Sequence, residues 1–177
     1  MSIVAISSIQ KYFSRVETPR FLNSKIQKLA LSHLKLRDVG GLRDRFEGQL
    51  YLDQLTEAIR AEYAFESFLG LNFDWKKRET TDYQRLTQFI ANSKIQLATF
   101  NLNKLPTINE IIPTVLVFLK PDKYAYIGPI LFEEQLSIIK CKNVDPLNNK
   151  TIINLNELNF ETMKYIKDYD DLLNVLK

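Results

Sequence analysis

The chain has 177 residues, of which 45% are hydrophobic and 25% charged, so it can bury the core of one globular domain. This composition excludes an intrinsically disordered chain, and a net charge of +3 is too small by itself to indicate a nucleic-acid partner. Cys141 is the only cysteine, which excludes an intrachain disulfide and argues against a cysteine-based metal site.

The beginning of the chain, MSIVAISSIQKYF, lacks the basic segment and long apolar stretch of a signal peptide. No apolar run approaches the length of about 20 residues that a membrane-crossing helix needs. Together with the single cysteine, these features predict a protein of the cytoplasm with no membrane partner.

Basic residues are concentrated near the beginning of the chain. Between Lys11 and Arg45 there are nine Lys or Arg residues and three acidic residues. Such a segment is suited to contact a phosphate backbone, and a solvated helix face is the alternative interpretation.

Helical spacing of apolar residues predicts a helix over residues 20–39, which the glycine pair at 40–41 ends. A second and longer helix is predicted over residues 43–69, with Gly70 as its C-terminal stop and Gly48 as a possible break. The next segment, LNFDWKKRETTDY, is expected to be a connection or an irregular strand.

The remainder of the chain is predicted to supply most of the strands. DYQRLTQFI and KIQLATF, separated by the turn ANS, indicate a β-hairpin, although the apolar residues of the first arm also fit one face of a short helix. PTVLVFLKP and YAYIGPI indicate two neighbouring strands. A short helix (FEEQLSII), a strand (TIINLNEL) and a terminal amphipathic helix (FETMKYIKDYDDLLNVLK) follow. The predicted fold is therefore α/β, with one mixed sheet flanked by helices over residues 43–177 and a basic N-terminal helical extension over residues 1–42.

The strand KIQLATF has two different faces. Side chains of a strand alternate, so Ile95 and Leu97 are expected on one face and Gln96 and Ala98 on the other. The second face thus pairs an amide with a small apolar residue in a chain otherwise rich in lysine.

The ordered set AEYAFESFLGL, TDY and SKIQLATF resembles the PD-(D/E)XK nuclease superfamily, which has the restriction-endonuclease-like fold. In that family a helix with a glutamate precedes a strand that opens with an aspartate. A hairpin then leads to a strand with Glu, Asp or Gln, one further residue, and Lys. The resemblance covers roughly residues 58–160 and implies a fold of the restriction-endonuclease type.

The resemblance also implies roles for individual residues. Glu62 matches the helix glutamate, Asp82 the metal-binding aspartate, and Gln96 the acidic or amide position; all three would hold Mg²⁺ and arrange the attacking water. Ala98 stands where the family has its lysine, and Thr81 replaces the usual proline. The implied activity is that of a site-specific, Mg²⁺-dependent endodeoxyribonuclease of restriction or homing type.

Two explanations of Ala98 are open. Either the chain is a naturally degenerate nuclease fold that binds without cutting, or the sequence is an inactivated form of an active enzyme. Lys94 and Lys104 belong to the same region and offer other cations.

Several candidates have a purely structural alternative. Glu57 or Glu66 can take the part assigned to Glu62, and Asp82 can simply start a turn or cap a helix. His33 is expected to be a surface or packing residue and not a base, and Tyr63 and Trp75 are expected to be core residues and not residues that stack on bases.

The partner implied by the resemblance is double-stranded DNA. Eight residues are expected to touch its backbone or bases, namely Lys25, Lys28, Lys35, Arg43, Lys94, Asn101, Asn103 and Lys104. Cutting both strands calls for two active sites, so the expected assembly is a homodimer or a higher symmetric oligomer. The alternative function is a non-catalytic module that binds DNA or protein on a degenerate nuclease fold.

Overall fold

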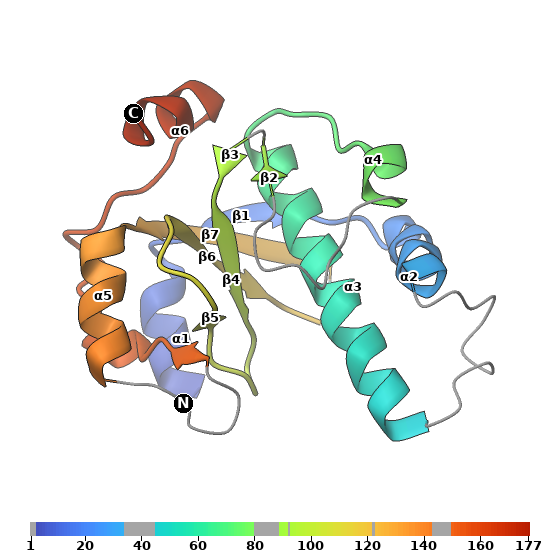
Figure 1. Cartoon of the computed structure of the whole chain (residues 1–177), viewed down its shortest axis with the longest axis horizontal. Coiled ribbons are helices and arrows are strands. Elements are labelled where there is room, and N and C mark those ends of the chain that lie inside the picture. Colours follow the sequence, from blue (N-terminus) through green and yellow to red (C-terminus); the bar gives the residue numbers. More distant parts are fainter. Residues whose placement is uncertain (1–2, 34–44, 80–88, 92, 122, 143–149) are drawn as a thin grey trace.

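A computed structural model describes residues 3–33, 45–79, 89–91, 93–121, 123–142 and 150–177. Its centre is a four-stranded sheet with the strand order β1-β7-β6-β4. These strands are β1 (Ser14–Glu17), β4 (Gln96–Phe100), β6 (Thr114–Leu119) and β7 (Tyr124–Leu131). β4 runs parallel to β6, whereas β6 and β1 run antiparallel to β7, so the sheet is mixed as expected (Figure 1).

β6 lies inside the sheet, and its composition explains why. All six of its side chains, TVLVFL, are buried, as is typical of a strand covered on both faces. β7 is buried over seven of its eight residues and pairs with β6 along its length. The prediction of two neighbouring strands from these apolar runs is confirmed.

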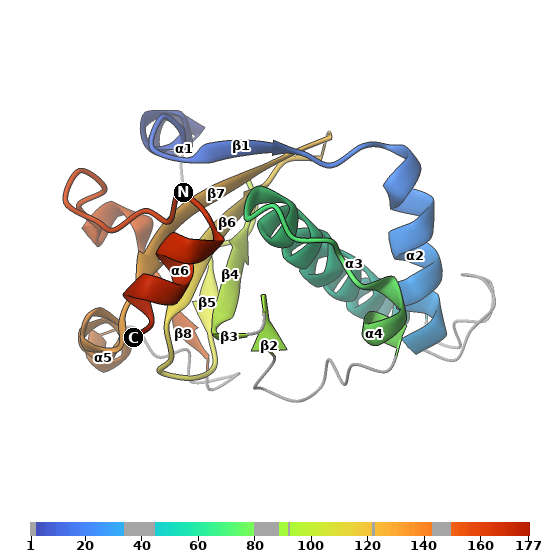
Figure 2. The ribbon, with the colours of Figure 1, turned by 90° about the horizontal axis from the view of Figure 1, so that it is seen from above.

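One face of the sheet is covered by the long helix α3 (Arg45–Phe68). Ala61, Ala64 and Phe65 of this helix are fully buried against Val115 and Val117 of β6, and the two alanines allow close approach of the backbones. α2 (Phe21–His33) and the short α4 (Trp75–Glu79) pack on the outer side of α3 (Figure 2).

The other face of the sheet is covered by α1 (Ile3–Gln10) and α5 (Glu133–Lys142), together with the 3₁₀ turn η2 (Leu155–Glu157). Figure 2 shows α1 and α5 across the sheet from α3. The last helix, α6 (Tyr169–Val175), is anchored by Leu172, which joins the core layer under α3. The helices therefore flank a central sheet on both sides.

The predicted end of the long helix is confirmed. Gly70 has φ +76°, and Leu71 N donates to Glu66 O in the bonding pattern of a glycine-terminated helix. Gly48 does not break α3, which is continuous through it. The predicted helix over 20–39 begins as expected, and its residues beyond 33 lie outside the described part.

Two elements differ from the sequence prediction. The segment expected to be a connection contains α4, because the Asp74 side chain accepts a hydrogen bond from Lys77 N and caps a helical turn. β1, within the part expected to be a helical extension, is a strand of the central sheet because it pairs with β7 from Ser14 to Glu17.

The predicted hairpin is described only around its turn. There β2 (Phe89–Ile90) and β3 (Ser93–Lys94) pair antiparallel, and β4 pairs parallel with β6; the rest of the first arm, residues 82–88, lies outside the described part. β5 (Thr107–Ile108) and β8 (Thr151–Ile152) form another small pair, so the predicted strand TIINLNEL is two residues of strand followed by η2.

Within the described segments, no helix combines the length and apolar character that a membrane crossing requires.

Candidate functional site

Glu62 is buried in an ion-pair cluster between α3 and α4. Its Oε2 atom lies 3.0 Å from Arg78 Nε, and the Arg78 side chain is itself only 4% exposed. Arg78 Nε makes no aligned hydrogen bond, so the contact with Glu62 is electrostatic. The Arg78 guanidinium also lies over the Phe73 ring, 4.9 Å from its centroid.

Glu66 is the second carboxylate of this cluster. It accepts a hydrogen bond of 2.6 Å from an Arg78 terminal nitrogen and one of 3.2 Å from Ala91 N, next to the β2–β3 turn. His33 joins from α2, with Nε2 donating to Arg78 O at 2.7 Å. The cluster thus ties α2, α3, α4 and the hairpin together, and His33 has the packing role expected of it.

Gln96 lies at the beginning of β4 and is half-buried. Its Nε2 atom donates to Glu110 O at 2.6 Å and to Thr114 Oγ1 at 2.8 Å. These bonds join the beginning of β4 to the end of the β4–β6 connection and to the first residue of β6. Both amide hydrogens of Gln96 are therefore used inside the protein.

Ala98 is 1% exposed and belongs to the core layer formed with α1 and α5. Its surroundings in that layer include Leu116 and Phe118 of β6. A lysine at this position would place a charged amine among apolar side chains, which is unfavourable unless the amine finds a partner or reaches water.

The alternation expected along β4 is present, and it separates the residues that the sequence grouped. Ile95 and Leu97 pack in the layer under α3, whereas Ala98 lies in the opposite layer. Gln96 shares the face of Ala98, so Glu62 on α3 and Gln96 on β4 lie on opposite sides of the sheet. Asp82 lies outside the described residues, and the described ones contain no group of three or more His, Cys, Asp or Glu that could hold a metal ion.

The turn after β4 holds three residues expected to touch DNA. Asn101 Nδ2 donates to Glu57 Oε1 at 3.0 Å, and Lys104 Nζ lies 3.4 Å from Glu57 Oε2. Asn103 is exposed, and its backbone N–H donates to Asn101 Oδ1. Glu57 therefore offsets the charge of Lys104, while Lys94 on β3 is exposed.

Lys25 and Lys28 on α2 border a surface hollow of about 340 Å³. The remaining lining residues, from α2 and α4, are Leu29, Ser32, Trp75 and Glu79. Lys25 Nζ lies 4.9 Å from the centroid of the Trp75 ring. We call this feature the α2–α4 hollow; Lys35 and Arg43, also expected to bind DNA, lie outside the described residues.

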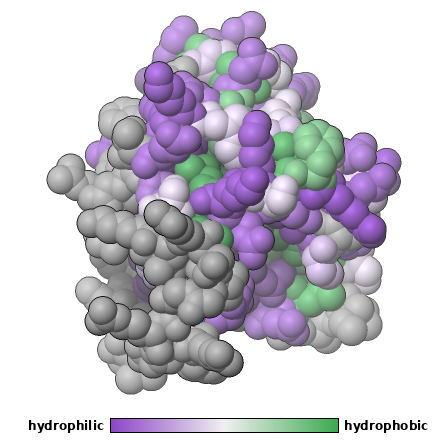
Figure 3. Space-filling model, turned by 90° about the vertical axis from the view of Figure 1, so that its right-hand side faces the viewer, coloured by the Kyte–Doolittle hydropathy of each residue, from purple (hydrophilic) through white to green (hydrophobic). Residues whose placement is uncertain are grey.

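The α2 wall of the α2–α4 hollow carries positive charge and no negative charge. α2 contains two lysines and no acidic residue. In the sequence this acid-free stretch extends from Thr18 to Arg37 and contains five basic residues. Figure 3 shows the side of the molecule that carries α2 and α4, where hydrophilic side chains surround smaller hydrophobic areas.

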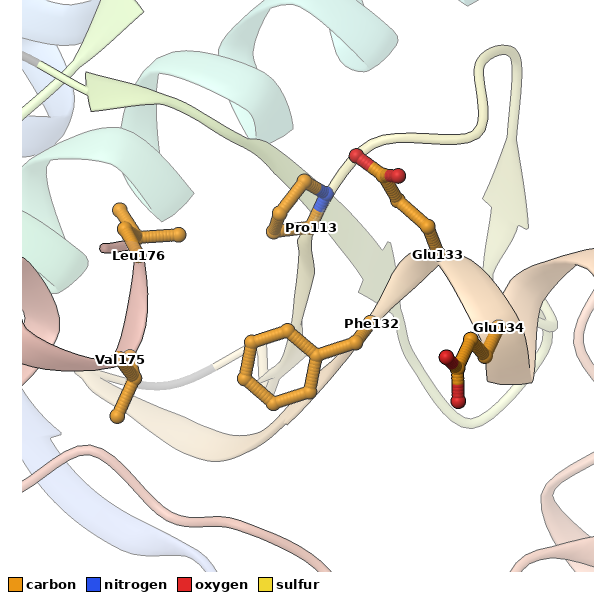
Figure 4. Close-up of a pocket in the computed structure, with 6 residues that line it drawn as sticks. All are labelled: Pro113, Phe132, Glu133, Glu134, Val175 and Leu176. Atoms are coloured by element: carbon orange, nitrogen blue, oxygen red, sulfur yellow. The ribbon is translucent and has the colours of Figure 1, made fainter.

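A second hollow of about 280 Å³ lies between the beginning of α5 and the end of α6. It is lined by Pro113, Phe132, Glu133, Glu134, Val175 and Leu176. In Figure 4 the Glu133 carboxylate points toward Pro113 and that of Glu134 points away. Two carboxylates make this hollow unfavourable for a phosphate, in contrast to the α2–α4 hollow.

Sequence reasoning missed Arg78 and the wall formed by α4. The available signal was Asp74 before WKKRE, a side chain suited to cap a helix, which would place Trp75, Arg78 and Glu79 within one helical turn.

No family model, no curated protein and no solved structure matches this chain.

Proposed function

We propose that this chain is a DNA-binding module that does not itself cut DNA, and that α2 and α4 form its contact surface. The supporting observation is the placement of Lys25 and Lys28 beside Trp75 on a helix without acidic residues. Lysines contact phosphates as point charges, and such contacts supply most of the affinity for duplex DNA.

The placement of the motif residues favours binding without cleavage. Glu62 is engaged by a buried arginine, and Ala98, at the position of the family's lysine, lies in an apolar layer. A metal-dependent nuclease needs oxygen ligands that converge on one point, and Glu62 and Gln96 lie on opposite sides of the sheet.

The test is fluorescence anisotropy with a labelled DNA duplex at low salt. We expect binding by the unsubstituted chain and a loss of roughly tenfold or more when Lys25→Gln and Lys28→Gln are combined, because two phosphate contacts are removed. The matched control is Lys150→Gln, an exposed lysine directly before β8, which lies far from α2 in Figure 2. Equal losses in both variants, or no binding by the unsubstituted chain, would contradict the proposal.

The endonuclease remains a second candidate. Its support is the order of the motif residues and the mixed sheet, in which Gln96 and Ala98 share one face of a strand parallel to its neighbour. Under this hypothesis Mg²⁺ is held by Asp82 and Gln96 without Glu62, which lies on the other side of the sheet, and a lysine at position 98 stabilises the charge that develops on the phosphate.

Ala98→Lys separates the two candidates. The purified variant is incubated with plasmid and genomic DNA, with Mg²⁺ or with EDTA, after its thermal unfolding has shown that it is folded. The binding module predicts no cleavage in either condition. Discrete fragments that depend on Mg²⁺ would establish the endonuclease instead.

A further inference from the structure

We propose that the α2–α4 hollow holds one unpaired nucleotide of a DNA strand, with the base against Trp75 and the phosphate beside Lys25 and Lys28. This inference rests on the proposed DNA-binding function and assigns a substrate feature to its contact surface. It concerns an unpaired nucleotide because a base within a duplex has both faces covered by its neighbours.

The hollow has the size and lining that such a ligand requires. Its volume of about 340 Å³ lies in the range of small-molecule sites. Trp75 and Leu29 give it apolar walls, while Lys25 and Lys28 give it two ammonium groups. An aromatic platform next to a positive groove is the usual arrangement for binding single strands.

The charges also set an orientation. Lys25 and Lys28 are on α2, whereas Glu79, the one carboxylate of the lining, is on α4. A phosphate is therefore attracted to the α2 wall and repelled from Glu79. With the phosphate on that wall, the base points toward α4 and reaches Trp75.

Trp75 is held in place by an aromatic cluster. Its ring centroid lies 4.7 Å from that of Phe73 and 6.1 Å from that of Tyr63, and the Phe73 and Tyr63 centroids are 5.6 Å apart. A fixed platform loses little freedom when a base stacks on it.

The buried ion pairs fix the helix that carries Trp75. Arg78, one turn along α4, is bound by Glu62 and Glu66 of α3, and its carbonyl accepts from His33 at the end of α2. The two walls of the hollow are thus held at a set separation. In this account Glu62 is a positioning residue for the nucleotide site.

Lys25 marks the face of Trp75 that the base would use. Its ammonium group lies over that ring at 4.9 Å, a favourable cation–π contact. When a nucleotide binds, the contact between the Lys25 ammonium group and the Trp75 ring is replaced by two contacts. The phosphate pairs with the ammonium group, and the base stacks on the ring.

The chain has a single tryptophan, so emission excited at the long-wavelength edge of the absorption band, where its eight tyrosines absorb little, reports on this site. The full chain is titrated with a 12-nucleotide single strand and, separately, with a labelled blunt duplex that is also followed by anisotropy. We expect the single strand to quench Trp75 emission in a saturable manner. The duplex is expected to bind with a much smaller change in emission.

A second measurement uses matched aromatic variants. We expect Trp75→Leu to weaken single-strand binding roughly tenfold, the effect of losing one stacked base, and to leave duplex binding within about twofold. Phe21→Leu is the control, because Phe21 is an exposed aromatic residue of α2 that does not line the hollow. Circular dichroism confirms that both variants are folded.

The outcomes distinguish this inference from the function on which it rests. If both DNAs bind but Trp75 emission is unchanged, or if Trp75→Leu binds the single strand normally, the nucleotide site is refuted and the DNA-binding function stands. If neither DNA binds, the proposed function fails and the nucleotide site fails with it.

Discussion

At the scale of single residues, the buried charged side chains in the described part of the chain form one connected set. Arg78, Glu62 and Glu66 are all buried, and the arginine contacts both carboxylates. Such a set is unlike an exposed ion pair, because removing one member leaves the others buried without compensation. Arg78 is therefore expected to matter most for stability, since it serves two carboxylates at once.

We expect Arg78→Met to lower the free energy of unfolding by about 3–5 kcal/mol, the typical cost of breaking a buried ion pair from one side. Urea unfolding followed by circular dichroism measures this. Lys76→Met is the matched control, because Lys76 is an exposed residue of the same helix, and a change of less than about 0.5 kcal/mol is expected there. A similar small effect of both variants would show that the cluster does not hold α4.

Gly128 is a residue whose missing side chain makes room for another. A Cβ atom there would lie 2.5 Å from Phe13 Cε2 and 3.0 Å from Leu116 O, closer than packed atoms allow. Phe13 is buried in the layer with Phe100 and Phe118, so its ring has little space to withdraw.

Gly128→Ala is therefore expected to destabilise the protein by about 1–3 kcal/mol through overpacking. Thermal and urea unfolding measure the change, and combining it with Phe13→Leu should recover part of the loss because the ring is removed. No recovery in the double variant would mean that the strain lies in the backbone of β7 instead of the Phe13 contact.

At the scale of elements, the sequence predicts those whose own residues contain the signal. α3, β6 and β7 each combine a long apolar pattern with deep burial, and all three are where the pattern predicts them. β1 has only the four residues SRVE, and its structure comes from pairing with β7, which no local pattern reveals.

The candidate site shows the same limit. The alternation along β4 correctly groups Gln96 with Ala98, because side-chain direction in a strand is a local property. What covers that face depends on distant elements, since the layer around Ala98 is built by α1 and α5. The pairing of Glu62 with Arg78 likewise depends on how α4 folds back on α3, and only the capping residue Asp74 hinted at α4.

α6 begins with a reciprocal capping arrangement whose strength depends on the protonation of Asp171. Asp168 Oδ1 accepts from Asp171 N, and Asp171 Oδ2 accepts from Lys167 N. The hydrogen bond from Lys167 N–H, with smaller help from the Lys164 ammonium, lowers the pKa of Asp171 below its ordinary value of 3.8. A carboxylate with a lowered pKa in the folded state stabilises the fold above its unfolded pKa and loses that contribution as the pH falls through the folded pKa.

We therefore expect Asp171→Asn to lower the melting temperature at pH 7 and to have a progressively smaller effect below about pH 4. Melting curves of both proteins from pH 7 to pH 2.5 measure the difference. Asp170→Asn, at the exposed neighbouring position, is the control. A difference that stays constant over this range would mean that Asp171 does not act through its charge.

At the scale of the whole molecule, the central sheet separates two layers of different character. The layer with α1 and α5 buries Ala98, whereas the α3 side carries α2, α4 and the hollow lined by Lys25 and Trp75. The acidic hollow at Glu133 lies elsewhere, between α5 and α6. Positive charge and an aromatic surface thus coincide at the α2–α4 hollow, and the proposal that DNA binds there rests on this coincidence.

The most direct measurement of this assignment is the salt dependence of duplex binding. Each phosphate contact made by a lysine contributes about 0.9 to the slope of the logarithm of the binding constant against the logarithm of salt concentration. We predict that combining Lys25→Gln with Lys28→Gln reduces this slope by about 2, and that Lys150→Gln leaves it unchanged. An unchanged slope in the double variant would contradict the account, because α2 would then not contact the phosphates.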